Sequence, residues 1–317
     1  MSASHPLSPS VCVVAGLVPA IRASLLSLLV LAPALPARAE TPSFAQDFAR
    51  ECATSEAPNL SAWRVSGALD PAVRPLRLTC AADAEGSHAL RIEVRPHDAY
   101  DAGNPGDNPT ERAEMLIRRD LVKFDQPVWY TFRFRLEAPW PGVVNRTVIH
   151  QIKQNIATDA EIERGGPCPA ANPFFKIEAG YRAETGSAAF VMKVRGTDDC
   201  RDGKAGIQKC GPWPLTLVEW HRVHVALKPS QHDGETDLRV WLDGRACAPF
   251  TGRLGYLDHG WLAANGNPVV DTQPRFGIYR DALPDASQAI EFADIVFWQK
   301  NPADDPAWAG IPLSPAP

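Results

Sequence analysis

Residues 274–280, near the C-terminus, read Pro-Arg-Phe-Gly-Ile-Tyr-Arg and carry side chains suited to acid–base chemistry. Arg275, Gly277 and Tyr279 alternate, so a β-strand would present all three on one face. A cation, a bare backbone position and a phenol would make a poor core. They would suit a groove that binds an acidic ligand and gives it a proton. Arg280, at the end of the segment, is a further candidate for ligand binding.

Two earlier segments place polar side chains at every second position in the same way. Arg112 and Glu114 would share one face of a strand. Gln151 and Lys153 would share one face of another strand, and His150 would point to the opposite face. If the three segments are neighbouring strands, these groups line one groove.

Each segment also has a simpler structural explanation. Charged residues are common on the solvated face of a sheet, so Arg112 and Glu114 could form only a salt bridge. His150 could be a hydrogen-bonded interior histidine, and Tyr279 alone could be an aromatic residue of the core or its rim. These alternatives stay open for each segment taken singly, whereas the three segments together favour a site.

The rest of the chain is typical of an all-β protein. Proline is abundant, at 30 of 317 residues, long helical periodicity is scarce, and short alternating runs recur between turn signals. Asp243-Gly244 directly follows one such run and predicts a tight hairpin turn. We expect strands at Ala89–Val94, Val128–Leu136, Thr147–Lys153, Phe174–Ala179, Ala188–Val194, Trp220–Leu227, Leu238–Leu242 and Ile290–Trp298.

The spacing of the polar residues resembles that of the jelly-roll polysaccharide lyases, which include heparin lyase I-like, glucuronan lyase-like and alginate lyase-like families. Those families carry an R-x-E strand, a Q-x-H strand and a late K-x-G-x-Y strand. Here 112–114 match the first motif, and 275–279 match the third with Arg275 in place of lysine. The resemblance extends from about Phe44 to Trp298. It implies a concanavalin-like β-jelly-roll sandwich of two antiparallel sheets, with the motifs on a concave face.

The middle motif departs from the family pattern. Lys153 stands where those lyases have histidine, and His150 precedes Gln151. Because side-chain direction reverses at every residue, His150 would need a bulge to reach the place of the family histidine. Three alternatives follow: the base has changed, His150 enters the groove through a kink, or Tyr279 serves in its place.

The resemblance implies β-elimination of a polysaccharide that contains uronic acid. Arg112 and Gln151 would neutralise the substrate carboxylate, so that a base could remove the adjacent C5 proton. Tyr279 would protonate the leaving glycosidic oxygen. Tyr279 could also act as the base if Arg275 or Lys153 stabilised its phenolate.

The remaining polar residues receive supporting roles in this scheme. Arg275 and Arg280 would bind substrate, and Glu114 would bind substrate or orient Arg112. The scheme requires no metal or other cofactor. A structural calcium in the loop Asp98–Asp107 is the one ion that the sequence leaves open.

The N-terminal 39 residues predict a secretory signal. Arg22 precedes an apolar run at 23–35, which is followed by an Ala-x-Ala cleavage pattern at 37–39. We therefore expect one domain at 40–317, located in the periplasm or secreted, with no membrane span and acting as a monomer. That domain holds 30 basic and 37 acidic residues, a balance that argues against a nucleic-acid partner.

Cysteine usage agrees with export, because six of the seven cysteines lie beyond the signal and an even number favours disulfides in an oxidising compartment. No C-x-x-C pair suggests zinc. Nearness in sequence favours the pairs Cys52–Cys80 and Cys200–Cys210, which leaves Cys168–Cys247.

Two segments predict long loops that could wall the site. Pro96–Pro109 is rich in Asp, Asn, Gly and Pro and leads directly into Arg112. Asp198–Pro214 would be a loop stapled by its own two cysteines. Long loops in a sandwich are usually functional.

Two other functions compete with a lyase. A glycoside hydrolase would need two carboxylates across the scissile bond, but Glu111 and Glu114 point apart on their strand, and so would Glu291 and Asp294. A non-catalytic carbohydrate-binding module would need no base and would use exposed aromatic residues. The candidates for that role are Trp140, Trp213 and Trp261.

Overall fold

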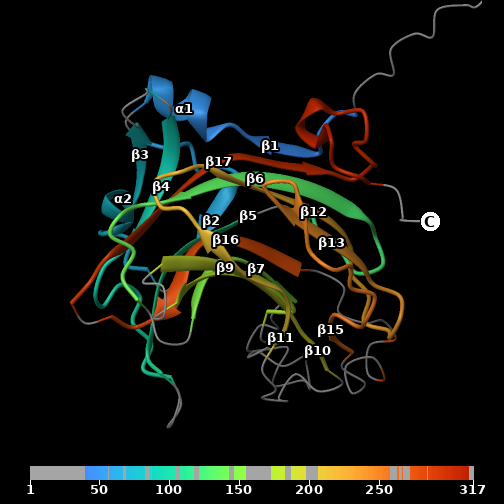
Figure 1. Cartoon of the computed structure of the whole chain (residues 1–317). Coiled ribbons are helices and arrows are strands. Elements are labelled where there is room, and N and C mark those ends of the chain that lie inside the picture. The colour runs from blue at the N-terminus through green and yellow to red at the C-terminus, as the bar shows by residue number, and fades with distance from the viewer. Residues whose placement is uncertain are drawn as a thin grey trace, which may run out of the picture. The chain divides into compact units, whose positions relative to one another are not determined.

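Alternating sequences fold into β-strands along most of this chain (Figure 1). Residues 38–317 form one unit. The predicted signal, residues 1–39, lies outside the described residues. The computed structural model describes residues 40–55, 57–66, 69–82, 86, 88–103, 108–117, 121–142, 146–154, 173–182, 187–197, 206–257, 263, 266, 272–283 and 285–313.

The strands form two large antiparallel sheets, and the all-β prediction is confirmed. The larger sheet contains β1 (Phe44–Gln46), β3 (Leu78–Ala82), β4 (His88–Val94), β6 (Val128–Leu136), β12 (His221–Lys228), β13 (Asp237–Leu242), β14 (Arg245–Ala246) and β17 (Gln288–Trp298). Its order is β14-β13-β12-β6-β17-β4-β3, and β1 pairs with β17.

The second sheet has seven strands in the order β11-β9-β8-β7-β16-β5-β2. They are β2 (Trp63–Val65), β5 (Thr110–Ile117), β7 (Thr147–Gln154), β8 (Phe175–Arg182), β9 (Ser187–Val194), β11 (Ile207–Leu215) and β16 (Thr272–Asp281). A separate parallel pair joins β10 (Gly196–Thr197) to β15 (Gly255–Tyr256).

All eight strands expected from the sequence are present, with ends that differ by one or two residues in most cases. The hairpin turn between β13 and β14 is also confirmed. Asp243 and Gly244 have φ of 50° and 80°, as a turn with two left-handed residues requires. The register of this hairpin therefore follows from the local sequence.

The core lies between the two sheets. Apolar residues alternate along each strand, so that Ala113 and Met115 of β5 point inward. Phe132 of the larger sheet meets Phe276 of the seven-stranded sheet, with ring centroids 5.2 Å apart. Each such fully buried side chain contributes about 1.5–3 kcal/mol. The polar residues that alternate with these apolar ones are thereby directed outward.

Short helices and the chain end cover parts of the larger sheet. Helix α1 (Phe48–Thr54) begins after Asp47, whose side chain caps the helix by accepting a hydrogen bond from the Arg50 backbone N–H. A second helix, α2, spans Arg74–Arg77, and the 3-10 helix η1 spans Pro306–Trp308. No helix among the described residues is long and apolar enough to cross a membrane.

Two disulfides join described cysteines, and one of them differs from the prediction. Cys52–Cys80 ties α1 to β3, as expected. Cys210 pairs with Cys247, so the expected Cys200–Cys210 and Cys168–Cys247 pairs are wrong. Their Cα atoms lie 5.3 Å apart although 37 positions separate them in sequence, because the pair links edge strand β11 to the segment that follows edge strand β14. Cys168 and Cys200 lie outside the described residues.

The loop predicted at Asp198–Pro214 is partly a strand. Residues from Ile207 onward form β11, which pairs with β9 at the edge of the seven-stranded sheet. The ladder shifts register on both sides of Cys210, which disguises the strand in the sequence. Residues 198–205 lie outside the described part of the chain.

Candidate active site

The three segments that carry the predicted site are neighbouring strands. Strand β16 lies between β5 and β7 in the seven-stranded sheet. Tyr279 lies opposite Arg112, Gly277 lies opposite Glu114, and Arg275 lies opposite Gln151. Directly opposed residues of antiparallel strands point to the same face. The outward face of the sheet therefore collects these groups.

Gly277 is required by the approach of β5 to β16. Its φ is +139°, which L side chains rarely adopt. A Cβ atom there would lie 2.3 Å from the carbonyl oxygen of Ala113 and 2.8 Å from Cα of Glu114. The glycine lets the two strands that carry Tyr279 and Glu114 pack closely.

His150 lies in the core, and the structure removes it from the candidate set. The ladders shift register between Val148 and His150, so Val148 faces outward opposite Tyr279 whereas His150 faces inward opposite Phe276. A bulge thus exists in β7, but it turns Val148 outward and leaves His150 on the face opposite Gln151, as simple alternation predicts. His150 is 1% exposed.

The bonds of His150 explain its role. Nδ1 donates to the carbonyl of Arg275 at 2.8 Å, and Nε2 accepts from the hydroxyl of Tyr130 at 2.9 Å. Burial lowers the pKa of His150 to about 3, although the bond to Arg275 opposes the shift. His150 is a satisfied neutral interior residue that holds β16 in place.

Arg280 is likewise buried and does not reach the outward face. It is fully buried and donates to Glu111, with Nη2 at 2.8 Å from the carboxylate. It also donates to the carbonyl of Ala286 at 2.7 Å. The expected substrate-binding role of Arg280 is wrong because Arg280 and Glu111 point to the inner side of their strands.

Glu114, Gln151 and Arg275 form a central cluster on the outward face. The Gln151 amide donates to the Glu114 carboxylate. Nη1 of Arg275 lies 3.7 Å from the same carboxylate. Glu114 therefore positions Gln151 and Arg275, not Arg112 as the sequence suggested. Gln151 and Glu114 are each 2% exposed, so the hydrogen bond between them is shielded from solvent.

Lys153 extends this central cluster along β7, opposite Gln273. No carboxylate among the described residues lies within ion-pair distance of its ammonium. Burial, helped by the positive charges of Arg275 and Arg112, lowers the pKa of Lys153 to about 8, although Glu114 opposes the shift. A lysine in this condition can lose its proton near neutral pH.

Tyr279 lies at the other end of the central cluster between two arginines. The guanidinium carbons of Arg112 and Arg146 lie 4.7 Å and 5.2 Å from the centre of its ring. Asp101 lies 3.6 Å from Arg112, and Asp281 accepts from Arg146 at 2.6 Å. Tyr279 is partly exposed, in contrast to the buried Arg275 and Gln151.

Two arginine donors on this face are buried without hydrogen-bond partners. Within the described residues, Nε of Arg112 and Nε of Arg275 have no hydrogen-bond partner, and Oε2 of Glu114 also has none. An unsatisfied buried polar group costs about 1–3 kcal/mol. A bound anion could satisfy both arginine donors.

Sequence reasoning missed several cations on this face. Arg146 precedes β7 and has no alternating partner. Lys176 and Glu178 alternate in β8, and Lys193 lies opposite Lys176 in β9. The Lys-x-Glu pattern of β8 was a usable signal, but only the strand order shows that it adjoins β7.

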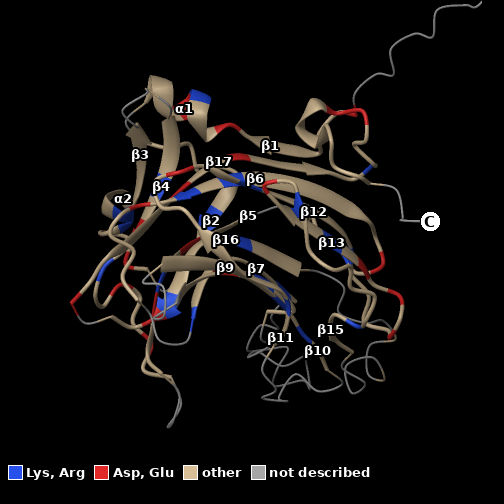
Figure 2. Ribbon diagram, in the orientation of Figure 1, with Lys and Arg blue, Asp and Glu red and all other residues tan. Residues whose placement is uncertain are grey.

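The outward face of the seven-stranded sheet is called the cationic face below, and Figure 2 marks the Lys and Arg positions along the ribbon. It is positive although the chain as a whole carries a formal net charge of −5. Among the side chains that the structure describes, its strands place six cations outward, which are Arg64, Arg112, Lys153, Lys176, Lys193 and Arg275, and three carboxylates, which are Glu114, Glu178 and Asp281.

The carboxylates proposed for a hydrolase do not form a catalytic pair. Glu111 is bound to Arg280 in the interior, whereas Glu114 faces outward. Glu291 and Asp294 do not fall on opposite faces as expected, because a register shift in β17 turns Asp294 to the side of Glu291. Both are held in ion pairs on the outer face of the larger sheet.

The tryptophans proposed for a binding module are mostly engaged in packing. Trp140 is 5% exposed and donates to the carbonyl of Ala179 at 3.2 Å. Trp213 stacks on Phe190 and lies under the guanidinium of Arg245. Trp261 lies outside the described residues.

The loop considered for calcium is bonded within the protein where it is described. Asp98 binds the Arg77 guanidinium and accepts from the Arg95 backbone N–H. Asp101 pairs with Arg112, and residues 104–107 lie outside the described part of the chain. No cluster of metal-ligating side chains occurs among the described residues.

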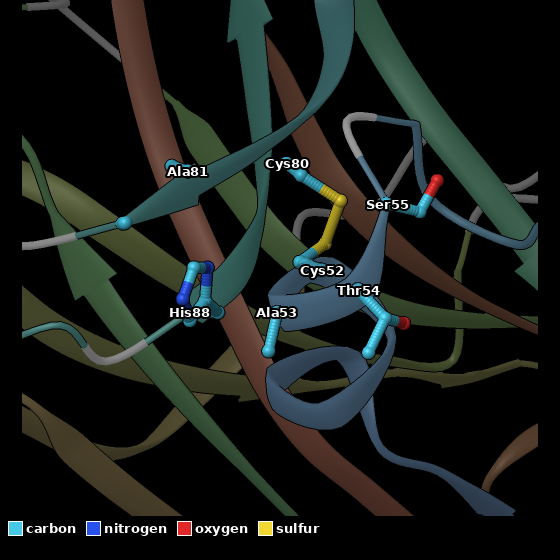
Figure 3. A pocket seen from close by; sticks show the side chains of 8 residues that line it. Cys52, Ala53, Thr54, Ser55, Cys80, Ala81 and His88 are labelled. Carbon is cyan, nitrogen blue, oxygen red and sulfur yellow. A yellow bond between two sulfur atoms is a disulfide. The ribbon is translucent and has the colours of Figure 1, made fainter.

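A hollow beside the Cys52–Cys80 disulfide is separate from the cationic face (Figure 3). Its walls come from α1, β3 and the start of β4. It is lined mainly by small side chains, with His88 the one ring. It brings together no set of groups for catalysis.

Comparisons with known proteins agree with this architecture. A family model described as "Polysaccharide lyase" matches residues 75–297. The endo-β-1,4-glucuronan lyase from the fungus Trichoderma reesei is similar in structure, with a TM-score of 0.52 and 14% identity, over 81% of this chain and 95% of that one. An alginate lyase mutant in complex with alginate trisaccharide has a TM-score of 0.48 and 12% identity, over 82% and 99%. A search of curated proteins found no match.

Proposed function

This chain belongs to the polysaccharide lyase family, and we propose that it cleaves a polymer of uronic acids by β-elimination on the cationic face. The observation that carries this proposal is the placement of Arg275, Gln151, Lys153 and Tyr279 on one face of adjacent strands. The positive charge of this face in an acidic protein favours an anionic polymer.

The first requirement of the reaction is to neutralise the substrate carboxylate. The C5 proton of a uronate is very weakly acidic while the attached carboxylate keeps its full negative charge. Arg275 has a buried donor without a partner, and Gln151 lies directly opposite it. Together they bind the carboxylate and stabilise the negative charge that develops when the proton leaves. Glu114 holds both donors in place.

We propose Lys153 as the general base. It occupies the position of the family histidine in the Q-x-H pattern, and its pKa of about 8 makes a neutral amine accessible. The amine takes the C5 proton, and the electron pair of the C–H bond forms the double bond between C4 and C5 as the bond from C4 to the glycosidic oxygen breaks.

Tyr279 supplies the proton that the leaving oxygen needs. Its hydroxyl donates that proton to the glycosidic oxygen and recovers one from the Lys153 ammonium through solvent. A sugar bound over Gln151 and Arg275 has Lys153 on one side and Tyr279 on the other. Arg112 and Arg146 add positive charge around Tyr279, which favours anionic substrate there.

Localisation follows from the same set of observations. The predicted signal at 1–39 and the disulfides Cys52–Cys80 and Cys210–Cys247 support action in an oxidising compartment, either the periplasm or the extracellular medium. Polymers of uronic acids are too large to enter a cell unaided, which agrees with cleavage outside the cytoplasm.

The test uses the full chain with glucuronan, alginate and heparin-like glycans, and it follows the ultraviolet absorbance of unsaturated uronate ends. The proposal predicts new absorbance with at least one polyuronate and its loss in Tyr279→Phe. New reducing ends without that absorbance would indicate a hydrolase, and binding without cleavage would indicate a carbohydrate-binding module. Either result would overturn the proposal.

A further inference from the structure

One row of outward side chains crosses the entire seven-stranded sheet. Each member lies directly opposite the next in the strand register, so the row runs perpendicular to the strands. From β2 to β11 it consists of Arg64, Leu116, Arg275, Gln151, Lys176, Lys193 and Gln208. We call it the transverse row.

Lys176 and Lys193 carry charge that the protein itself only partly neutralises. The two ammonium groups lie 2.9 Å and 2.6 Å from opposite oxygens of the Glu178 carboxylate. Two cations therefore share one carboxylate. Like charges directly opposite each other on adjacent strands are destabilising, so an additional anion at this point would be stabilising.

Exposure shows that these lysines remain accessible. The Glu178 side chain is 4% exposed, whereas those of Lys176 and Lys193 are 22% and 25% exposed. The buried carboxylate fixes the two lysines at the face, and both lysine side chains remain partly exposed. This arrangement differs from that of Arg280, which is fully buried together with its carboxylate partner Glu111.

We propose that Lys176 and Lys193 form a second anion-binding subsite, which binds the carboxylate of a sugar near the reacting one. Adjacent strands are about 4.8 Å apart, so the point between Lys176 and Lys193 lies about two strand spacings from the Arg275–Gln151 pair. Two sugars of an extended 1,4-linked chain span a similar length, and because successive sugars turn over, every second carboxylate returns to the same side of the chain. A polymer lying along the transverse row would therefore place the carboxylate of the second sugar from the reacting one between Lys176 and Lys193. This inference rests on the proposed function.

The experiment compares two double variants with the unmodified protein. Lys176→Gln with Lys193→Gln removes both charges of the subsite and keeps similar side-chain lengths. Lys228→Gln with Lys300→Gln removes two charges elsewhere, from the end of β12 in the larger sheet and from the segment after β17. Because both pairs change the net charge equally, the control accounts for general electrostatic attraction.

Steady-state cleavage and calorimetric binding are measured with two homopolyuronates, glucuronan and alginate. We expect the subsite pair to raise KM for the homopolyuronates about tenfold, which corresponds to about 1.4 kcal/mol. The loss should fall on KM rather than kcat, and the control pair should change KM by less than about twofold. An unchanged KM, or an equal change in the control, would overturn the subsite.

Binding separates failure of the subsite from failure of the proposed function. If the unmodified protein forms no unsaturated product from any polymer, the proposed function is wrong. Calorimetry then still tests the subsite. Homopolyuronate binding that is weaker in the Lys176 and Lys193 double variant, but unchanged in the Lys228 and Lys300 control, supports it.

Discussion

Lys153 combines a cost to stability with a gain in reactivity, and both can be measured. The lowering of its pKa from 10.5 to about 8 is worth about 3 kcal/mol at about 1.4 kcal/mol per unit. At pH 7 about one molecule in ten then has a neutral Lys153, against about one in three thousand for an ordinary lysine. The site therefore makes the base form available at the expense of folding free energy.

Two substitutions separate these effects. Lys153→Met removes the buried charge, so we expect it to raise the free energy of unfolding at pH 7 by about 1–3 kcal/mol in a denaturant titration. Lys153→Arg keeps the charge but supplies no base, because a guanidinium is not deprotonated in proteins. Both variants should lower kcat by about 10²- to 10⁴-fold.

The pH dependence has a defined sign. Because the folded-state pKa lies below the unfolded value, the contribution of Lys153 to stability improves as pH rises from about 8 to 10.5 and is least favourable below 8. In the same molecule kcat/KM should rise with pH and level off above about 8. A Lys153→Arg variant that retains more than about a tenth of kcat, or a flat profile from about pH 6 to 9, would refute Lys153 as the base.

Three further predictions follow from the contacts. Gly277→Ala should lower stability by about 2 kcal/mol or more, because its Cβ meets the β5 backbone, whereas Gly234→Ala, with open space around its Cβ, should cost only about 1 kcal/mol; equal losses in thermal unfolding would contradict this. Because His150 is buried in its neutral form, the free energy of unfolding should fall as pH drops from about 6.5 toward 3. His150→Gln should make that fall smaller, and an acid titration as steep as that of the unmodified protein would contradict this. Replacing both Cys210 and Cys247 with serine should cost about 4 kcal/mol for a loop of 37 residues, and an unchanged denaturation midpoint would exclude the bond.

The sequence predicts the strands well because their signal is local. A run such as 128–136 alternates over its whole length and is bounded by turn residues, so its type and inward face follow without knowledge of the fold. The alternation of Arg112 with Glu114, and of Arg275 with Tyr279, likewise survives into the structure. These positions depend only on the two-residue period of a strand.

Features that depend on which strands and cysteines meet in the folded chain could not be predicted in this way. Val148 faces outward beside Tyr279 because a bulge between Val148 and His150 changes the alternation, and the sequence carries no mark of it. Cys210 meets Cys247 through the packing of two sheet edges, where nearness in sequence has no influence. Lys193 joins the cationic face only because β9 follows β8 in the sheet.

The central claim, that the chain cleaves its polymer by elimination on the cationic face, is tested most directly by cleavage in water labelled with heavy oxygen. Elimination adds no water, so mass spectrometry of the short products should show no label incorporated by the cleavage step, with an unsaturated uronate at each new non-reducing end. Anomeric exchange is controlled with unlabelled reducing sugars, and Tyr279→Phe should form no product. Label incorporated at every cleaved bond, or full activity of Tyr279→Phe, would contradict the account.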